Sequence, residues 1–290
     1  GMNFPSHSLR GLATGHLITL CASLIGLCLC LTSPNAAHAQ APHTKHAAQH
    51  HKKSKKKLPH SAQASGKPSD RKMAAVSGTP LTNNPEVLVW TQDAATRLQL
   101  DPNWVQKTMN QAQRLAVVEK LVLPPVSPVA KDWGAYRARF IEPVRIQAGL
   151  RFWLKHKQAL ERAEREYGVP ASIVVGIIGV ETLYGQNTGN FRVVDALGTL
   201  AFHFPQAHPR AAERQAFFRS ELEQFLQLTA RSGADPLSVR GSYAGALGLP
   251  QFMPSSWAKF AVDFDGDGRI DLFGSPQDAI GSVANYFQAF

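Results

Sequence analysis

One glutamate, Glu181, has the sequence surroundings of a general acid. It is the first charged residue after an uncharged run from Tyr167 to Val180. Residues 171–183 are apolar on nearly all sides, which predicts a central buried helix. Apolar neighbours would remove water from the carboxyl group and raise its pKa from about 4.3. A pKa near 6 would provide an acid at neutral pH. The alternative is a glutamate that pairs with a buried arginine or caps a neighbouring helix.

A segment rich in small residues, 241–256, could hold a polar ligand. It reads GSYAGALGLPQFMPSS and mixes glycine and alanine with hydroxyl, amide and aromatic groups. Such a stretch suits a sugar-binding groove, in which backbone amides approach the ligand and flat rings stack on it. A glycine-rich loop followed by a helix capped at Ser255 or Ser256 is a compatible interpretation.

An acidic segment, 263–271, follows with the sequence DFDGDGRID. Its carboxylates at loop positions 1, 3, 5 and 9, with glycine at position 6, match the first nine positions of an EF-hand. The pattern departs at position 12, where Gly274 stands instead of glutamate, but Asp278 could close a longer loop. The sequence therefore predicts a structural calcium site over 263–278. The alternative is an acidic turn without metal.

The rest of the chain after residue 84 has mainly helical patterning. Apolar residues recur at three- and four-residue spacing over 85–98, 101–115 and 146–167. Asp101-Pro102 is a typical helix start, and Gly168-Val169-Pro170 ends one helix and opens the next. Because alternating strand patterns are scarce, we expect a mainly α fold.

The positive charge lies mostly in one segment outside this helical part. The chain has a net charge of +10. Residues 40–73 hold eight lysines and Arg71 against Asp70, which gives +8. Arg10 adds one charge, so about +1 remains after Met73. A nucleic-acid-binding domain would carry its basic patch on the folded part, so no nucleic-acid partner is expected.

The N-terminus has the pattern of an export signal. Arg10 precedes an apolar run over 16–31, and Ala37-His38-Ala39 offers small residues for cleavage, which predicts a signal peptide over 1–39. An uncleaved anchor is the alternative, but the run is short for a membrane span. All three cysteines lie inside this signal and follow leucines, so neither a disulfide nor a lipid anchor is expected in the mature chain.

Residues 40–82 are polar and basic, which predicts a disordered linker. The run HHKKSKKK at 50–57 could make weak electrostatic contact with wall polymers or a membrane surface. Its histidines could also chelate a metal, or the run could be a solvated spacer.

The motifs in this order resemble the lytic murein transglycosylase B family of the lysozyme-like superfamily. The resemblance covers about 84–290 and is closest in 167–170, 173–182, 195–197, 241–256 and 263–287. It implies a catalytic domain over 83–290 with a lysozyme-like α+β core, an added helical region and the EF-hand-like loop. The family's chains continue beyond Phe287, so a C-terminal part is expected to be missing here.

The resemblance implies a periplasmic enzyme that cuts peptidoglycan between N-acetylmuramic acid (MurNAc) and N-acetylglucosamine (GlcNAc) without water. Glu181 would protonate the leaving oxygen and then, as a base, assist attack by the MurNAc C6 hydroxyl, which yields a 1,6-anhydro sugar. Ordinary glycosidases need two carboxylates, but an internal nucleophile removes that need. No second acid in this sequence has an equally apolar setting.

The resemblance also assigns further site residues by position. Substrate contacts are implied for Ser242 and Gln251 at the cut, and for Tyr136 and Tyr286 in the groove, although both tyrosines could instead pack in the core. Calcium ligands are implied at Asp263, Asp265, Asp267, the Arg269 carbonyl and Asp278, with Asp271 a weaker candidate. No organic cofactor is implied, and a monomer is the default expectation. The competing hypotheses are a hydrolytic lysozyme and a non-catalytic peptidoglycan-binding or assembly protein.

Overall fold

The computed structural model describes residues 78–124, 132–138 and 140–290, without the side chains of Ala135 and Tyr136. The predicted signal peptide and most of the predicted linker lie outside these residues. The end of the linker prediction is wrong, because Thr79–Pro80 form a strand and Leu81 is fully buried. The amide of Leu81 donates to the carbonyl of Ala112 at 3.0 Å, which fixes this segment to the fold. No helix in the described part is long and apolar enough to span a bilayer.

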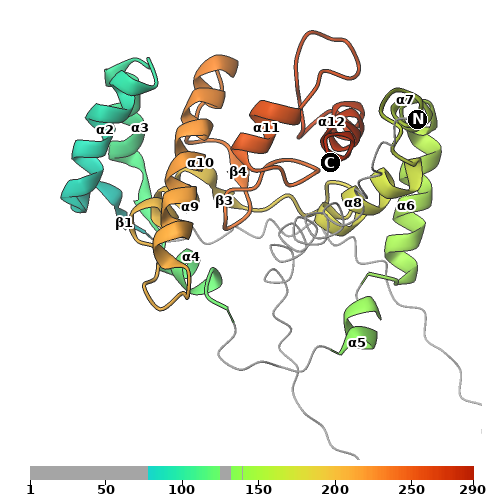
Figure 1. Cartoon of the computed structure of the whole chain (residues 1–290), viewed down its shortest axis with the longest axis horizontal. Helices are drawn as coiled ribbons and strands as arrows, with labels where there is room; N and C mark the ends of the chain where they lie inside the picture. The colour runs from blue at the N-terminus through green and yellow to red at the C-terminus, as the bar shows by residue number, and fades with distance from the viewer. Residues whose placement is uncertain (1–77, 125–131, 139) are drawn as a thin grey trace, which may run out of the picture. The chain divides into compact units, whose positions relative to one another are not determined.

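The described chain is mainly helical, as predicted (Figure 1). Four two-residue strands form two antiparallel pairs, β1 with β2 and β3 with β4. The elements are β1 (Thr79–Pro80), η1 (Leu81–Asn83), α2 (Pro85–Arg97), α3 (Pro102–Gln111), β2 (Gln113–Arg114), α4 (Ala116–Leu121), α5 (Trp133–Ala138), α6 (Pro143–Lys155), α7 (Lys157–Tyr167), α8 (Ala171–Thr182), β3 (Phe191–Arg192), α9 (Val193–Phe202), α10 (Ala211–Ser232), β4 (Arg240–Gly241), α11 (Pro254–Phe260) and α12 (Pro276–Gln288).

Local sequence signals explain several helix boundaries. The side chain of Asp101 accepts a hydrogen bond from the amide of Asn103 at 2.9 Å, and Pro102 occupies the first turn of α3. Gly168 ends α7 with a φ of 71°, a conformation that favours glycine. These two boundaries confirm the corresponding sequence predictions.

Two helix predictions were wrong in extent. The helix expected over 101–115 ends at Gln111, because the next residues leave the helix to pair with β1. The helix expected over 146–167 is two helices, α6 and α7, which are separated at His156 by a non-helical backbone with φ −113° and ψ 23°. Tertiary pairing and packing override the local helical pattern at both places.

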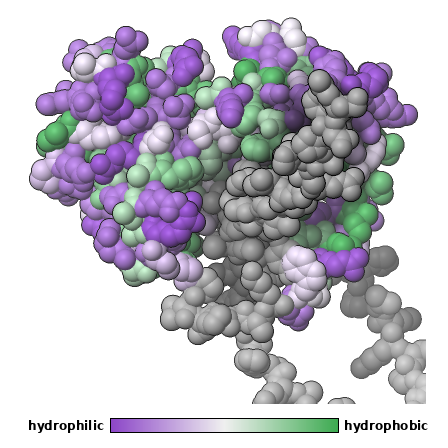
Figure 2. All heavy atoms as spheres, in the orientation of Figure 1, coloured by the Kyte–Doolittle hydropathy of each residue, from purple (hydrophilic) through white to green (hydrophobic). Residues whose placement is uncertain are grey.

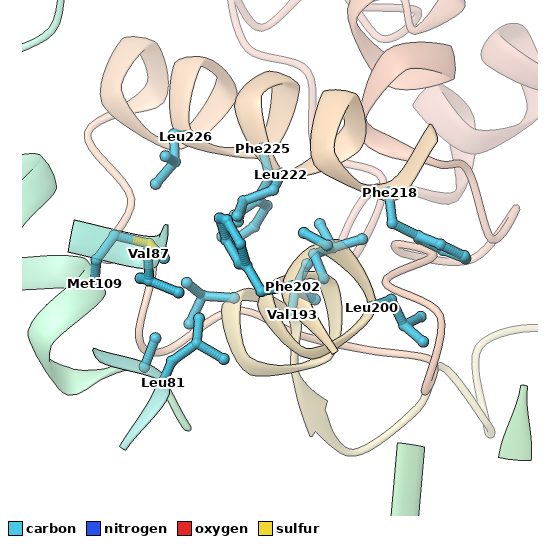
Figure 3. Close-up of a cluster of buried hydrophobic side chains, with 14 of the residues drawn as sticks. Leu81, Val87, Met109, Val193, Leu200, Phe202, Phe218, Leu222, Phe225 and Leu226 are labelled. Atoms are coloured by element: carbon cyan, nitrogen blue, oxygen red, sulfur yellow. The ribbon is translucent and has the colours of Figure 1, made fainter. Parts of the chain in front are cut away.

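One buried apolar cluster is built around the contact between α9 and α10 (Figure 3). The polar side chains of α9 attach the N-terminal elements to this cluster. The amide of Gln113 donates to Asp195 at 2.9 Å, and the amide of Leu115 donates to the Thr199 hydroxyl at 2.9 Å. Side chains drawn in the figure include Leu81, Val87, Met109, Leu200, Phe202, Phe218, Leu222, Phe225 and Leu226.

A second apolar cluster surrounds α8, which contacts α6, α7 and α12. Phe264, from the acidic loop, is 2% exposed and belongs to this cluster. The Arg162 guanidinium lies 4.0 Å from the Phe264 ring centre and donates to the Phe264 carbonyl at 2.7 Å. The acidic loop is therefore anchored in the same core as the helix that carries Glu181.

Helix α8 is less enclosed than its composition predicts. Its inner face is buried, as predicted for a central helix, but Ile173 is 46% exposed, so the apolar residues on the opposite face do not indicate burial there. Exposed apolar residues also follow the outer face of α6, where Leu150 and Leu154 are 59% and 75% exposed. Figure 2 shows hydrophobic residues on this flank and mostly polar residues over α2 and α3.

Candidate active site

Glu181 lies in the last turn of α8 and is 5% exposed. Burial raises the pKa of its carboxyl from the usual 4.5 to about 8. A nearby arginine would shift this pKa in the opposite direction, so desolvation is the dominant influence on this carboxyl. A carboxyl group with this pKa carries a proton at neutral pH and can therefore donate it to a leaving group.

The backbone makes a sharp turn directly after the helix that carries Glu181. Leu183, Tyr184 and Gly185 have φ values of 52°, 58° and 89°, all in the left-handed region. This conformation costs a non-glycine residue of the order of 1–3 kcal/mol, so the surrounding structure must hold it in place. Turns of this kind are often found at functional sites.

Thr182 makes the hydrogen bonds that support this turn. Its hydroxyl accepts from the amide of Gly185 at 3.0 Å and donates to the carbonyl of Leu249 at 2.9 Å. Its own carbonyl accepts from the amide of Asn187 at 2.9 Å. Because Leu249 belongs to the glycine-rich segment 241–256, the structure brings that segment into contact with the residue that follows Glu181.

Tyr184 packs between α6 and α8, where its hydroxyl lies against Gly149 and Gly179. A β-carbon on Gly149 would lie 2.6 Å from the Tyr184 hydroxyl oxygen, and one on Gly179 would be closer still. The Arg145 guanidinium donates a hydrogen bond to the carbonyl of Gly179. Burial raises the pKa of the Tyr184 hydroxyl, so it is a neutral group in this packing.

The two polar residues predicted in the glycine-rich segment are both buried. The Ser242 hydroxyl accepts from the amides of Ala244 at 3.2 Å and Ala246 at 3.0 Å, which leaves its own proton for a further acceptor. The side-chain amide of Gln251 donates to the carbonyls of Thr188 at 3.1 Å and Gly248 at 3.0 Å. Gln251 therefore braces the loop through both of these bonds.

The two predicted groove tyrosines differ in what the structure shows. The ring of Tyr286 is 8% exposed and lies 4.9 Å from the ring of Phe260 and 5.5 Å from that of Phe252. This environment favours the core-packing alternative for its ring. The backbone of Tyr136 lies in α5, but its side chain is outside the described residues.

The acidic loop brings together three of the predicted metal ligands. Carboxylate oxygens of Asp263, Asp265 and Asp278 lie within 4.8 Å of one another. Hard oxygen donors of this kind suit calcium. Asp271 is not part of this group, and its carboxylate accepts from the amides of Phe273 at 2.9 Å and Gly274 at 2.8 Å.

A second buried glutamate, Glu221 on α10, was missed from the sequence. It is 2% exposed, and its carboxylate accepts from the amide of Ser255 at 2.9 Å and from the Ser255 hydroxyl at 2.5 Å. Glu221 thus caps α11, which begins at Pro254, and the predicted caps at Ser255 and Ser256 were wrong. The helical spacing of the sequence could have indicated its burial. Glu221 lies three residues after Phe218 and four before Phe225, on the buried face of α10.

A cavity of about 520 Å³ lies elsewhere, between α2 and α10. Glu86, Arg219 and Glu223 line it, and it shares no residue with the region around Glu181. The Arg219 guanidinium donates to Glu86 at 2.8 Å, and Arg97 pairs with Glu223 at 2.9 Å. These charges are paired across the two helices, so the cavity is explained by helix packing.

Known proteins provide an independent comparison. Residues 83–290 match the family described as the transglycosylase SLT domain. The chain is 43% identical over 221 residues to membrane-bound lytic murein transglycosylase B of Escherichia coli K12, over 73% of this chain and 59% of that protein.

Two solved structures extend the comparison to the fold. Soluble lytic transglycosylase SltB1 from Pseudomonas aeruginosa has a TM-score of 0.65 and 48% identity, over 71% of this chain and 66% of that one. The E. coli lytic transglycosylase Slt35 in complex with calcium has a TM-score of 0.66 and 43% identity, over 73% and 65%. The chain spans less than two thirds of the length of each of these three relatives.

Proposed function

We propose that this chain, which belongs to the transglycosylase SLT domain family, cuts the glycan strands of peptidoglycan without hydrolysis. The observation that supports this most directly is Glu181. It is a buried carboxyl group with a pKa of about 8, and the residue after it is hydrogen-bonded to the glycine-rich segment. Such a group holds a proton at neutral pH and can also accept one after the first step, as a single acid/base requires.

The proposed reaction moves one proton out and one proton back. Protonated Glu181 donates to the glycosidic oxygen between MurNAc and GlcNAc, and the bond from MurNAc C1 to that oxygen breaks. The Glu181 carboxylate then takes the proton of the MurNAc C6 hydroxyl as that oxygen bonds to C1. The products are a 1,6-anhydro-MurNAc end and a free GlcNAc 4-hydroxyl, and Glu181 is protonated again.

The glycine-rich segment is proposed to hold the sugar at the cut. The Ser242 hydroxyl has a proton to donate, and Gln251 can present its side-chain oxygen. Tyr136 and Tyr286 are proposed to line the groove near Glu181. The ring of Tyr286 already packs against the rings of Phe252 and Phe260, which limits the part of this side chain that could contact substrate.

The acidic loop is proposed to bind a structural calcium ion. Asp263, Asp265 and Asp278 form its centre, and Asp267 and the Arg269 carbonyl are proposed to complete it. The donor set fits the ion because calcium prefers several carboxylate and carbonyl oxygens. Bound calcium would offset the repulsion of these acids and stabilise a loop whose Phe264 is packed in the core.

The cellular setting is proposed from the N-terminal sequence. Residues 1–39 are proposed to direct export to the periplasm and to be cleaved, without a lipid anchor. The enzyme is proposed to act there as a monomer. The basic segment over 40–77 is proposed to act as a spacer with weak contact to the wall or membrane surface. No nucleic acid and no organic cofactor is part of this proposal.

The experiment that tests the function uses purified sacculi and mass spectrometry of the released muropeptides. The wild-type chain is compared with Glu181→Gln and with Glu221→Gln, a matched variant at the other buried glutamate. Anhydro products from wild type and Glu221→Gln, and none from Glu181→Gln, are expected. Reducing MurNAc ends would make the protein a hydrolytic lysozyme, and binding to sacculi without any products would make it a binding protein.

A further inference from the structure

We propose that Thr182 is a positioning residue for Glu181, with its hydroxyl tying the acid to the glycine-rich segment. This inference rests on the proposed function. Thr182 is 1% exposed, and its hydroxyl joins three separate pieces of backbone. It donates to the carbonyl of Leu249, accepts from the amide of Gly185 and also lies 3.3 Å from the carbonyl of Ile178.

The partner of this hydroxyl is itself tightly fixed. Leu249 lies at the tip of a turn that is closed by reciprocal backbone bonds between Leu247 and Phe252 at 2.8 and 3.0 Å. The amide of Leu249 donates to the carbonyl of Leu272 at 2.8 Å. Leu272 is fully buried and follows Asp271, so the turn is held between the end of α8 and the acidic loop.

A continuous hydrogen-bonded path therefore runs from the acidic loop to the residue after the acid. It passes from the Leu272 carbonyl to the Leu249 amide, and from the Leu249 carbonyl to the Thr182 hydroxyl. The amide of Asp271 continues the path, since it donates to Asp278 at 2.8 Å. Among the hydrogen bonds of the described residues, Thr182 provides the only α8 side chain in this path.

The backbone conformation of the turn after Glu181 explains why the hydrogen bonds of the Thr182 hydroxyl are needed. Leu183 and Tyr184 have left-handed backbone conformations, which persist only where surrounding contacts impose them. The Thr182 hydroxyl provides one of these contacts through the Gly185 amide. Without it the turn can relax and α8 can shift at its end, which moves the carboxyl of Glu181 relative to Ser242 and Gln251. A general acid displaced by about 1 Å loses on the order of a hundredfold in rate.

The test compares Thr182→Val, which keeps the shape and removes the hydroxyl, with Thr182→Ser, which keeps the hydroxyl. Turnover is measured on soluble uncrosslinked glycan strands by quantifying anhydro ends. Thr182→Val is expected to lower kcat by roughly tenfold to a hundredfold with little change in KM, and Thr182→Ser is expected to retain most of the wild-type kcat. Hydrogen exchange of the Gly185 amide should become faster in Thr182→Val only.

Thr229→Val is the matched control for a merely structural effect. Thr229 is also buried on a helix and donates to the carbonyl four residues earlier, at 2.9 Å, but it lies on α10. Its substitution is expected to lower thermal stability and leave kcat unchanged. A Thr182→Val variant with wild-type kcat, or an equal loss of kcat in Thr182→Ser, overturns the positioning role. The absence of anhydro products from the wild type overturns the proposed function and this role with it.

Discussion

The hydroxyl of Tyr184 occupies the space in which a side chain at Gly149 of α6 would lie. A β-carbon at residue 149 would be only 2.6 Å from the hydroxyl oxygen, and Gly179 on α8 approaches it from the other side. Because Gly149 and Gly179 have no side chains, α6 and α8 can pack closely against Tyr184. Because Tyr184 belongs to the turn that follows Glu181, this packing bears on the position of the acid.

Gly149→Ala is therefore expected to push Tyr184 out of place. The added methyl group would cost about 1–3 kcal/mol of stability, as overpacking of a well-packed core does, and lower activity on sacculi. Gly176→Ala is the control on α8, because a β-carbon there meets no atom within 4 Å. That change should stabilise the protein by about 0.5–1 kcal/mol and leave activity intact. Urea unfolding and muropeptide release measure both effects; a neutral Gly149→Ala would contradict the packing argument.

The raised pKa of Glu181 predicts a pH-dependent cost in stability. The folded carboxyl binds its proton up to a pKa of about 8, whereas the unfolded one loses it near 4.5. Below pH 4.5 both states are protonated and there is no cost. Between pH 4.5 and 8 the unfolded state releases its proton, so the folded state loses up to about 1.4 kcal/mol for each pH unit.

Glu181→Gln removes this titration. The variant should be as stable as wild type near pH 4 and more stable near pH 8, by a margin that grows between the two. Urea unfolding at a series of pH values measures the difference. A constant margin would show that Glu181 is not a buried neutral acid. In the wild type, the rate that depends on protonated Glu181 should fall as the pH rises above about 8.

The sequence predicted the parts of the fold that depend on local chemistry. The caps at Asp101 and Gly168, the mainly helical content and the burial of Glu181 follow from residues within a few positions of each other. The break at His156 depends instead on how α6 and α7 pack, and no local breaker marks it. Ser255 shows the same limit, because its partner Glu221 lies 34 residues away.

The residues of the candidate site also divide into those that the sequence indicated and those that only the folded structure shows. Residue types and spacing indicated Glu181 and the acidic loop, because a carboxyl in an apolar run and a row of aspartates are visible in one dimension. The role of Thr182 was invisible there, since its bond to Leu249 spans 67 residues. A threonine that follows a glutamate predicts no particular role from sequence alone, because its hydrogen-bond partner is known only once the glycine-rich turn is folded.

Calcium is expected to raise the thermal midpoint of the wild-type chain, and chelation by EGTA is expected to lower it. Asp263→Asn should abolish most of this shift, because Asp263 belongs to the cluster of carboxylates that lie within 4.8 Å. Asp271→Asn is the control within the same loop, since Asp271 lies outside the group of three aspartates whose carboxylate oxygens approach one another. Differential scanning calorimetry with and without calcium gives the readout. Equal shifts in both variants would contradict the proposed ligand set.

The Glu221 cap is expected to matter for stability and not for chemistry. Glu221→Ala would leave the Ser255 amide and hydroxyl without their acceptor and should cost about 1–3 kcal/mol. Glu221→Gln keeps one acceptor oxygen for the amide and should cost less. Because burial raises the pKa of Glu221 despite these bonds, the advantage of wild type over Gln should shrink as the pH rises.

Urea unfolding of the three proteins at two pH values measures these differences. Muropeptide release at a temperature where all of them remain folded separates stability from catalysis. Anhydro products should persist in both variants, because Glu221 fixes α11 and does not reach the bond that is cut. Loss of turnover in fully folded Glu221→Gln would instead place a second carboxyl group in the reaction, as in glycosidases that use two acids.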